Sequence, residues 1–253
     1  MQKIKITAIS YLNTMPFVYG MRHSDYLKEN STIDFATPSE CADRLLSGAT
    51  DVGIVPVAIL PKLKNYTIVA PFCIGAVGKV ASVSLFSDVP LSKIKKIALD
   101  YQSRTSVALV QILAEKYWKI KPEFINSQPG FEKKIGGELS GVVIGDRALM
   151  MQKRFLYNYD LSEEWFQFTE LPFVFALWVS TKTLPDTFTR ALKKALKNGL
   201  SCIDEMVLQQ KEKIIPASDI LEYLKINLSY DFNEQKKKGM ELFLRYLSEM
   251  NQK

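Results

Sequence analysis

Short apolar runs alternate with amphipathic stretches along the first part of the chain. Runs rich in β-branched residues and bounded by turn-forming residues predict three strands, over residues 4–9, 32–37 and 51–57. One helix is expected to begin near Thr14 with Pro16 in its first turn, and a second to span residues 38–46 with Ser39 as its cap. This β-α-β-α-β series predicts a parallel sheet with right-handed crossovers.

The same alternation begins again after a pair of extended runs. Strands are expected over residues 66–74, 78–87, 96–100, 123–126 and 139–145, with helices over residues 103–118 and 131–135. Aromatic and β-branched residues predict one extended return strand over residues 165–180. The rest of the chain is expected to be helical, over residues 186–198, 201–210, 218–224 and 233–250.

Two α/β units, the second inserted before a helical return to the first, predict an α/β protein with two lobes. We expect the first lobe to contain residues 1–88 and 176–253 and the second to contain residues 89–175, with crossings near residues 84–90 and 172–180. Ligands of open parallel sheets bind beyond the carboxyl ends of the strands. The two lobes are therefore expected to enclose a ligand cleft that closes by hinge motion.

Composition narrows the classes of function. The chain is 47% hydrophobic and 24% charged, as expected of an ordinary globular protein. Its net charge of +6 comes with lysines in three separate groups, at residues 93–96, 193–197 and 236–238, and no nucleic-acid-binding module accompanies them. No segment approaches the ~20 apolar residues of a membrane span, so we expect neither nucleic acid nor membrane as a partner. A basic surface instead favours a small anionic substrate.

Cysteine usage and the start of the chain indicate the compartment. Cys41, Cys73 and Cys202 are far apart and the only histidine is His23, which argues against a Cys/His zinc site and suits a reducing cytosol. Residues 1–5 lead directly into a strand and lack the apolar stretch of about 7–15 residues found in a signal peptide. A cytoplasmic location is therefore expected.

Four polar segments are expected at the carboxyl ends of strands, where a ligand would bind. They are Ser10 to Asn13, Ser82 with Ser84, Ser103 to Ser106, and Gly145-Asp146. The third begins a long helix, whose unpaired N–H groups suit an anion, and Arg104 adds a guanidinium fork that matches a carboxylate. Each segment also has a purely structural interpretation, in which the same side chains cap helices or lie on a half-exposed strand. Both interpretations stay open on the residues alone.

Cofactor and nucleophile motifs are absent from the sequence. Residues 75–78 (Gly-Ala-Val-Gly) have neither the lysine nor the helix of a phosphate loop, and no GxGxxG or GxSxG pattern occurs. His23 lies in a polar, loop-like stretch, which favours a surface position over a catalytic base. We therefore expect no cofactor and no metal ion.

Several phrases, in order along the chain, resemble one known family. They are residues 9–16 (ISYLNTMP), 51–57 (DVGIVPV), 82–87 (SVSLFS), 103–106 (SRTS), 144–146 (IGD) and 171–178 (LPFVFALW). Over about residues 4–180 the set resembles the chorismate dehydratase family of the futalosine route to menaquinone. One departure is Glu170, where the family is expected to carry glycine before Leu-Pro-Phe-Val.

The resemblance implies a type II periplasmic-binding-protein fold and a cofactor-independent carbon–oxygen lyase. Its substrate would be chorismate, which loses water to give 3-[(1-carboxyvinyl)oxy]benzoate. Asn13 and Asp146 are the expected catalytic residues: Asn13 orients the C4 hydroxyl or the ring, and Asp146 is one candidate base. The other candidate base is the enolpyruvyl carboxylate of the substrate itself.

The expected substrate-binding residues come from the same four segments. Ser84, Thr105 and Ser106 would hold a carboxylate, with Ser82 and Arg104 as secondary candidates. The neighbouring residues Ser10, Ser103 and Gly145 complete the expected set.

Other functions compete with this interpretation. The 1,4-dihydroxy-6-naphthoate synthase of the same pathway shares the fold, but we expect it to use a cleft histidine as base, and His23 is poorly placed for that. A non-catalytic binding protein for a small carboxylate is expected to carry a leader or a lipobox cysteine. A ligand-sensing effector would need a DNA-binding module, and the C-terminal helices contain no recognisable helix-turn-helix phrase.

Overall fold

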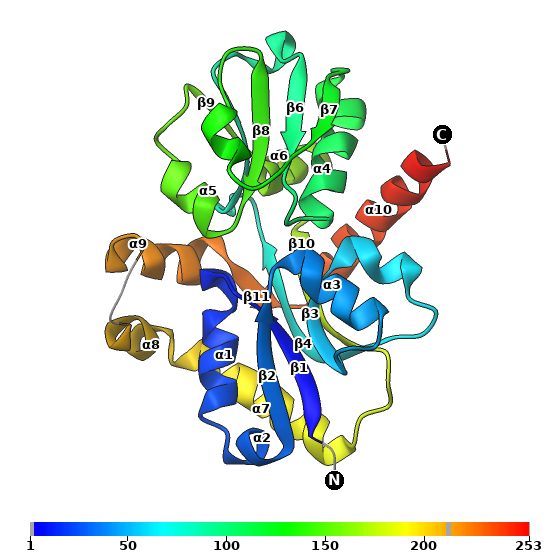
Figure 1. Cartoon of the computed structure of the whole chain (residues 1–253), viewed down its shortest axis with the longest axis vertical. Helices are drawn as coiled ribbons and strands as arrows, with labels where there is room; N and C mark the ends of the chain where they lie inside the picture. Colours follow the sequence, from blue (N-terminus) through cyan, green and yellow to red (C-terminus); the bar gives the residue numbers. More distant parts are fainter. Residues whose placement is uncertain (1–2, 211–213, 253) are drawn as a thin grey trace.

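Two lobes, each built on its own β-sheet, make up the fold (Figure 1). The computed structural model describes residues 3–210 and 214–252. Six strands form the sheet of the first lobe, in the order β11-β4-β10-β3-β1-β2, and five form that of the second, in the order β7-β6-β8-β5-β9. The second lobe lies above the first in Figure 1.

The elements have the following bounds. The strands are β1 (Ile4–Ile9), β2 (Ser31–Ala36), β3 (Val52–Pro56), β4 (Thr67–Ala76), β5 (Val83–Ser87), β6 (Lys96–Leu99), β7 (Glu123–Asn126), β8 (Leu139–Ile144), β9 (Tyr157–Asp160), β10 (Phe173–Ser180) and β11 (Ser229–Asp231). The α-helices are α1 (Met15–Arg22), α2 (Asp25–Asn30), α3 (Pro38–Leu46), α4 (Thr105–Leu113), α5 (Asp146–Met151), α6 (Leu161–Thr169), α7 (Asp186–Ser201), α8 (Ile203–Gln209), α9 (Ala217–Glu222) and α10 (Glu234–Asn251). Short 3-10 segments are η1 (Leu12–Thr14), η2 (Val57–Lys62), η3 (Leu91–Lys93) and η5 (Phe131–Lys134), and π-helical turns are η4 (Ala114–Trp118) and η6 (Tyr223–Asn227).

The first sheet begins with the predicted parallel series. β1 lies between β2 and β3 and pairs in parallel with both, so that Ile6 faces Ile33 on one side and Val52 on the other. Three antiparallel strands, β10, β4 and β11, extend the sheet beyond β3. β11 was not predicted, because a strand of three residues shows too little alternation to be recognised.

Two glycines bring α1 against α7 and thereby fix the start of α1. A Cβ atom on Gly20 would lie 2.0 Å from the carbonyl oxygen of Ala195, and one on Gly199 would lie 1.8 Å from that of Pro16. Only glycine permits backbones to approach this closely. The contact holds the first turn of α1, and with it the turn η1 that follows β1.

The predicted cap of α3 is wrong by two residues. Thr37 caps this helix: its hydroxyl accepts the Glu40 N–H, and the Glu40 carboxylate accepts the Thr37 N–H in return. Ser39 instead contacts the second lobe, where its N–H donates to the Gln102 carbonyl (3.1 Å) and its hydroxyl accepts from Arg104 (3.3 Å).

The second sheet contains a strand that runs against its neighbours. β6 pairs in parallel with β7 and β8, whereas β5 is antiparallel to both β8 and β9. Val83 at the start of β5 therefore faces Ile144 at the end of β8. The predicted strand over residues 78–87 begins only at Val83, so Ser84 lies in a strand as expected, but near its start and not at its carboxyl end. Ser82 precedes β5, and the antiparallel direction is what brings it to the edge where β8 ends.

Strand pairing also places the crossings earlier than predicted. β5 pairs within the second sheet, so the first crossing lies before it, at residues 77–82. The predicted return strand over residues 165–180 is two elements, because α6 ends at Thr169 and β10 begins at Phe173. Glu170 between them has a φ of 59°, the left-handed conformation that favours glycine. This is the position where the resemblance led us to expect glycine.

A buried aromatic cluster joins the lobes away from the sheet edges. Trp165 of α6 contacts Phe173 of β10 and Phe243 of α10 edge-on, with ring centroids 5.3 and 6.3 Å apart. All three rings are buried, which stabilises the join by removing large apolar surfaces from water. Over residues 3–210 and 214–252, no helix has the length and apolar character needed to cross a membrane.

Candidate active site between the lobes

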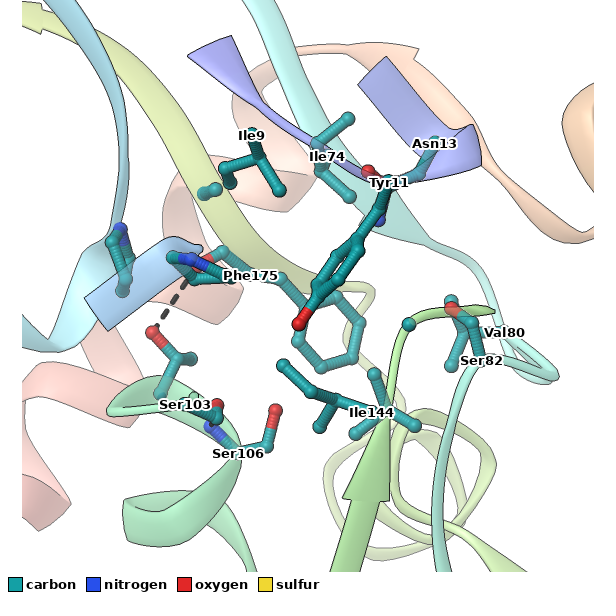
Figure 2. Close-up of a pocket in the computed structure, with 16 residues that line it drawn as sticks. Ile9, Tyr11, Asn13, Ile74, Val80, Ser82, Ser103, Ser106, Ile144 and Phe175 are labelled. Carbon is teal, nitrogen blue, oxygen red and sulfur yellow. Dashed lines mark hydrogen bonds between the residues drawn. The ribbon is translucent and has the colours of Figure 1, made fainter. Parts of the chain in front are cut away.

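A cavity lies between the two lobes, a common position for small-molecule sites. Its lining comes from the carboxyl ends of β1, β3, β4 and β8, the first half of β10, the starts of α3 and α4, and the first crossing (Figure 2). The lining residues are Ile9, Tyr11, Asn13, Pro38, Pro56, Ile74, Val80, Ser82, Val83, Ser103, Thr105, Ser106, Ile144, Gly145, Phe175 and Ala176. No charged side chain is among them.

The structure brings together six of the ten predicted site residues. Those that line the cavity are Asn13, Ser82, Ser103, Thr105, Ser106 and Gly145. Those outside the lining are Ser10, Ser84, Arg104 and Asp146. The apolar residues and the rings of Tyr11 and Phe175 were not predicted as site residues, although both aromatic residues lie inside phrases that carry the family resemblance.

Asn13 presents an unpaired oxygen at the cavity. It lies in η1, directly after β1, and is 9% exposed. Among the residues that the structure describes, no group forms a hydrogen bond with its Oδ1 atom. A buried amide oxygen without a partner is costly, which favours a ligand group that donates a hydrogen bond to it.

Tyr11 crosses from the first lobe to the second. Its hydroxyl donates to the side-chain oxygen of Gln102, and its ring packs on Gly145, where a Cβ atom would lie 2.7 Å from the ring. Gly145 has a φ of 65°, so glycine is required both for the backbone conformation and for the ring contact. Burial raises the pKa of Tyr11, and the nearby carboxylate of Asp100 raises it further, so the phenol remains neutral.

Ser82 is held in place from two sides. The carboxylate of Asp160 accepts the N–H groups of Val80 (3.0 Å) and Ala81 (2.6 Å), which fixes the crossing just before Ser82. The Ser82 hydroxyl accepts a hydrogen bond from the buried hydroxyl of Tyr223 at 2.8 Å. Tyr223 belongs to the C-terminal helical part, from which no site residue was predicted.

The start of α4 contributes three hydroxyl groups with different partners. Thr105 Oγ1 donates to the Phe175 carbonyl (3.1 Å) and accepts the Ala58 N–H (3.3 Å), so it joins the lobes. Ser103 Oγ accepts the Ser106 N–H (3.0 Å) in the first turn of the helix. Within the described residues the Ser106 hydroxyl has no hydrogen-bond partner, and Figure 2 shows it on the same wall as Ser103.

Arg104 does not reach the cavity. Its guanidinium group forms an ion pair with Asp43 at 2.5 Å and a hydrogen bond with Ser39, both in α3 of the first lobe. Arg104 therefore bridges the lobes. The positive charge that faces the cavity is the partial charge at the N-terminus of α4.

Asp146 also bridges the lobes. Its Oδ1 atom accepts the N–H of Leu12 at 3.0 Å. Burial raises its pKa to about 6, and the Leu12 hydrogen bond opposes this rise. The next residue, Arg147, forms an ion pair with Asp100 at 2.8 Å and donates to Gln102 at 2.7 Å, which holds the partner of Tyr11 in place.

Three other predicted or considered residues lie away from the cavity. Ser84 is fully buried inside β5, and its hydroxyl has no hydrogen-bond partner among the described residues. Ser10 is exposed and lines a separate surface hollow together with His23. His23 is exposed, as expected of a surface residue, and its ring lies tilted against that of Tyr19. No cluster of three or more His, Cys, Asp or Glu side chains suited to a metal ion occurs in the described parts of the chain.

Comparisons with known proteins agree with this architecture. A protein of Archaeoglobus fulgidus has a solved structure with a TM-score of 0.76 at 13% identity, covering 99% of this chain and 98% of that one. A Candida albicans protein, described as exhibiting the generic periplasmic binding protein structural fold, has a TM-score of 0.67 at 12% identity, covering 98% and 90%. At such identities the likeness concerns the fold alone, and it confirms the predicted two-lobed, periplasmic-binding-protein-like fold.

Sequence comparisons identify the family in addition to the fold. A chorismate dehydratase of Thermus thermophilus is 28% identical over 263 residues, covering 94% of this chain and 92% of that protein. The family model for menaquinone biosynthesis matches residues 4–249. Because this match spans nearly the whole chain, including the C-terminal helices, the protein belongs to the menaquinone-biosynthesis family.

Proposed function

We propose that this protein removes water from chorismate to give 3-[(1-carboxyvinyl)oxy]benzoate, as a carbon–oxygen lyase. The named activity of the Thermus thermophilus relative supports this reaction. The observation that carries the proposal is a largely apolar cavity whose polar groups are hydroxyls, one amide and a helix N-terminus. Such a lining suits a small ring substrate whose carboxylate and hydroxyl groups bind at these few polar positions.

The reaction requires no change of oxidation state outside the substrate. The C3–H bond and the C4–O bond break, the electron pair of the former becomes part of the ring, and the proton and hydroxide leave together as water. The ring becomes aromatic, which drives the elimination. A base for the C3 proton and a hydrogen bond to the departing hydroxyl are the groups needed, and the proposal includes no cofactor.

The start of α4 is the proposed site for one carboxylate of the substrate. Unpaired N–H groups at the N-terminus of a helix and the positive end of its dipole favour an anion. The Ser106 hydroxyl, which lines the cavity, adds a donor. Thr105 contributes less than the sequence predicted, because its hydrogen already goes to the Phe175 carbonyl.

Asn13 is the proposed partner of the C4 hydroxyl. Its unpaired Oδ1 accepts the hydroxyl hydrogen and thereby orients the ring for elimination. For the base, the geometry favours the enolpyruvyl carboxylate of the substrate over Asp146. Asp146 lies outside the cavity lining and already accepts the Leu12 N–H.

The test is to incubate purified protein with chorismate, without added cofactor, and to identify the product by mass and by its aromatic absorbance. Loss of one water is expected. Chorismate that is bound but unchanged would contradict the proposal and favour a binding protein. A second measurement addresses the base: Asp146→Asn is expected to keep turnover within a few-fold of the wild type, and a large loss would restore Asp146 as the base.

The rival synthase of the same pathway is less well supported. The cleft histidine expected for it has no counterpart in this cavity, because His23 is exposed and lines another hollow. A cytoplasmic location is part of the proposal, and the three cysteines, all without disulfide bonds, suit a reducing compartment.

A further inference from the structure

Tyr223 reaches the candidate active site from behind its lining. It begins η6, is 2% exposed, and lies outside the cavity lining. Its hydroxyl donates to Ser82 Oγ at 2.8 Å, across 141 positions of sequence. The hydroxyl that it contacts is buried and lines the cavity, so Tyr223 acts on the site through another side chain.

This hydrogen bond determines what Ser82 offers to a ligand. A serine hydroxyl has one hydrogen to donate and can accept as well. Because Ser82 Oγ accepts the hydrogen of Tyr223, its own hydrogen is available to a group in the cavity. Burial raises the pKa of Tyr223, so the phenol keeps the hydrogen that it donates.

The same phenol also interacts with Asn13. The side chain of Asn13 lies close enough to the phenol to lower its pKa, against the larger effect of burial. Its Oδ1 atom is left without a partner among the described residues, and Asn13 itself lines the cavity.

We infer that Tyr223 is a positioning residue that sets the hydrogen-bond polarity of the cleft. It holds Asn13 so that Oδ1 accepts, and it holds Ser82 so that the hydroxyl donates. One acceptor beside one donor complements a substrate hydroxyl, which donates to Asn13 and accepts from Ser82. The inference rests on the proposed function only where it identifies the substrate hydroxyl as the C4 hydroxyl of chorismate. Tyr223 itself transfers no proton.

A double-mutant cycle tests the route of action. Tyr223→Phe removes the hydroxyl and keeps the ring, and we expect kcat to fall by about 10-fold, with KM within about 3-fold of the wild-type value. The same change is then made in a Ser82→Ala background. There the factor by which Tyr223→Phe lowers kcat is expected to be smaller by at least about 3-fold, because part of its effect depends on Ser82. Equal factors in the two backgrounds, or wild-type kcat in Tyr223→Phe, would overturn the inference.

Tyr230→Phe is the matched control. Tyr230 is also a buried tyrosine near the end of the chain, its hydroxyl has no partner among the described residues, and it lies outside the cavity lining. Its removal is expected to leave kcat and KM unchanged. A fall in kcat like that of Tyr223→Phe would show that loss of any buried phenol suffices, which contradicts a specific role for Tyr223.

A spectroscopic measurement separates this inference from the proposed function. In ¹⁵N-labelled protein, the side-chain amide signals of Asn13 are expected to shift, and their hydrogen exchange to accelerate, in Tyr223→Phe but not in Tyr230→Phe. Unchanged Asn13 amide signals in Tyr223→Phe would refute the inference, whatever the substrate. Absence of chorismate turnover in the wild type would refute the proposed function and leave this result to decide on Tyr223.

Discussion

The two polar ends of the cleft use similar side chains for different purposes. At one end, Ser82 accepts a hydrogen bond from Tyr223 and the Oδ1 atom of Asn13 has no partner among the described residues, so a donor and an acceptor remain for the cavity. At the other end, Thr105 uses its hydroxyl to join Ala58 and Phe175, whereas the Ser106 hydroxyl has no partner within the described ranges. The difference shows that a hydroxyl at a strand or helix end can donate to a ligand only where its hydrogen is not already donated within the protein.

Removing the acceptor at the Asn13 end should have the largest effect. Asn13→Ala is expected to reduce kcat by about 100-fold or more, as for other groups that orient the reacting bond. Thermal unfolding checks that the variant is folded, because it loses the interaction of the amide with the buried Tyr223 although Oδ1 has no protein partner to lose. Turnover within a few-fold of the wild type would show that Asn13 does not orient the substrate.

Ser106→Ala tests the other end at its unpaired hydroxyl. A hydrogen bond to a charged group contributes about 1.5–3 kcal/mol, so KM for chorismate is expected to rise by about 10-fold or more. We expect kcat to change less, because the carboxylate is bound in both the ground state and the transition state. Steady-state kinetics would contradict this assignment if KM were unchanged.

Thr105→Val tests the hydroxyl next to Ser106, which is already used within the protein. The change should leave the Phe175 carbonyl and the Ala58 N–H unpaired, at a cost of about 1–3 kcal/mol each. For a chain of this size the melting temperature is expected to fall by about 2–4 °C per kcal/mol. Calorimetry on Thr105→Val and Ser106→Ala together provides the control, since only the former should be destabilised. A rise in KM without loss of stability would instead place Thr105 among the substrate-binding groups.

Asp146→Asn should have the smallest effect, visible in the pH dependence of stability. The pKa of Asp146 is raised from 3.8 to about 6 in the folded protein, so between these values the folded state binds more protons than the unfolded state. The contribution of this group to stability therefore falls as pH rises through that window.

Asparagine does not ionise and can still accept the Leu12 N–H. The melting temperature of the variant minus that of the wild type is therefore expected to rise from pH 4 to pH 7. Asp160, whose pKa burial also raises to about 6, is present in both proteins and cancels in the difference. A difference that is flat across this range would contradict a raised pKa for Asp146.

Most elements could be predicted from the sequence because the alternation of apolar residues and the turn residues that specify them lie close together along the chain. The runs that became β1, β6, β7 and β8 match the expected strands within one or two residues at each end, and α3 spans the predicted residues. The failures occur where neighbours in space decide. Trp165 begins an aromatic-rich run that predicted a strand, but it lies in α6, where its ring packs against β10 and α10.

The family resemblance made it possible to predict individual site residues. The structure then separated those that line the cavity from those that do not. Asn13 and Ser106 line the cavity with unpaired groups, whereas Arg104 pairs with Asp43 and Ser84 is enclosed in β5. No sequence pattern distinguishes these cases. A serine or arginine near a strand end has the same sequence signature whether its partner is a ligand or another part of the chain.

The sequence by itself determined most strands and helices, the presence of two α/β units and the family to which the protein is similar, but not α6 or β11. These follow from periodicity, turn residues and ordered phrases, all of which act over short separations along the chain. Only the tertiary structure decided which polar groups remain available to a ligand. That depends on partners far away in sequence, such as Tyr223 for Ser82 and Phe175 for Thr105, because a hydrogen-bonding atom is free or used only in relation to what folding places beside it.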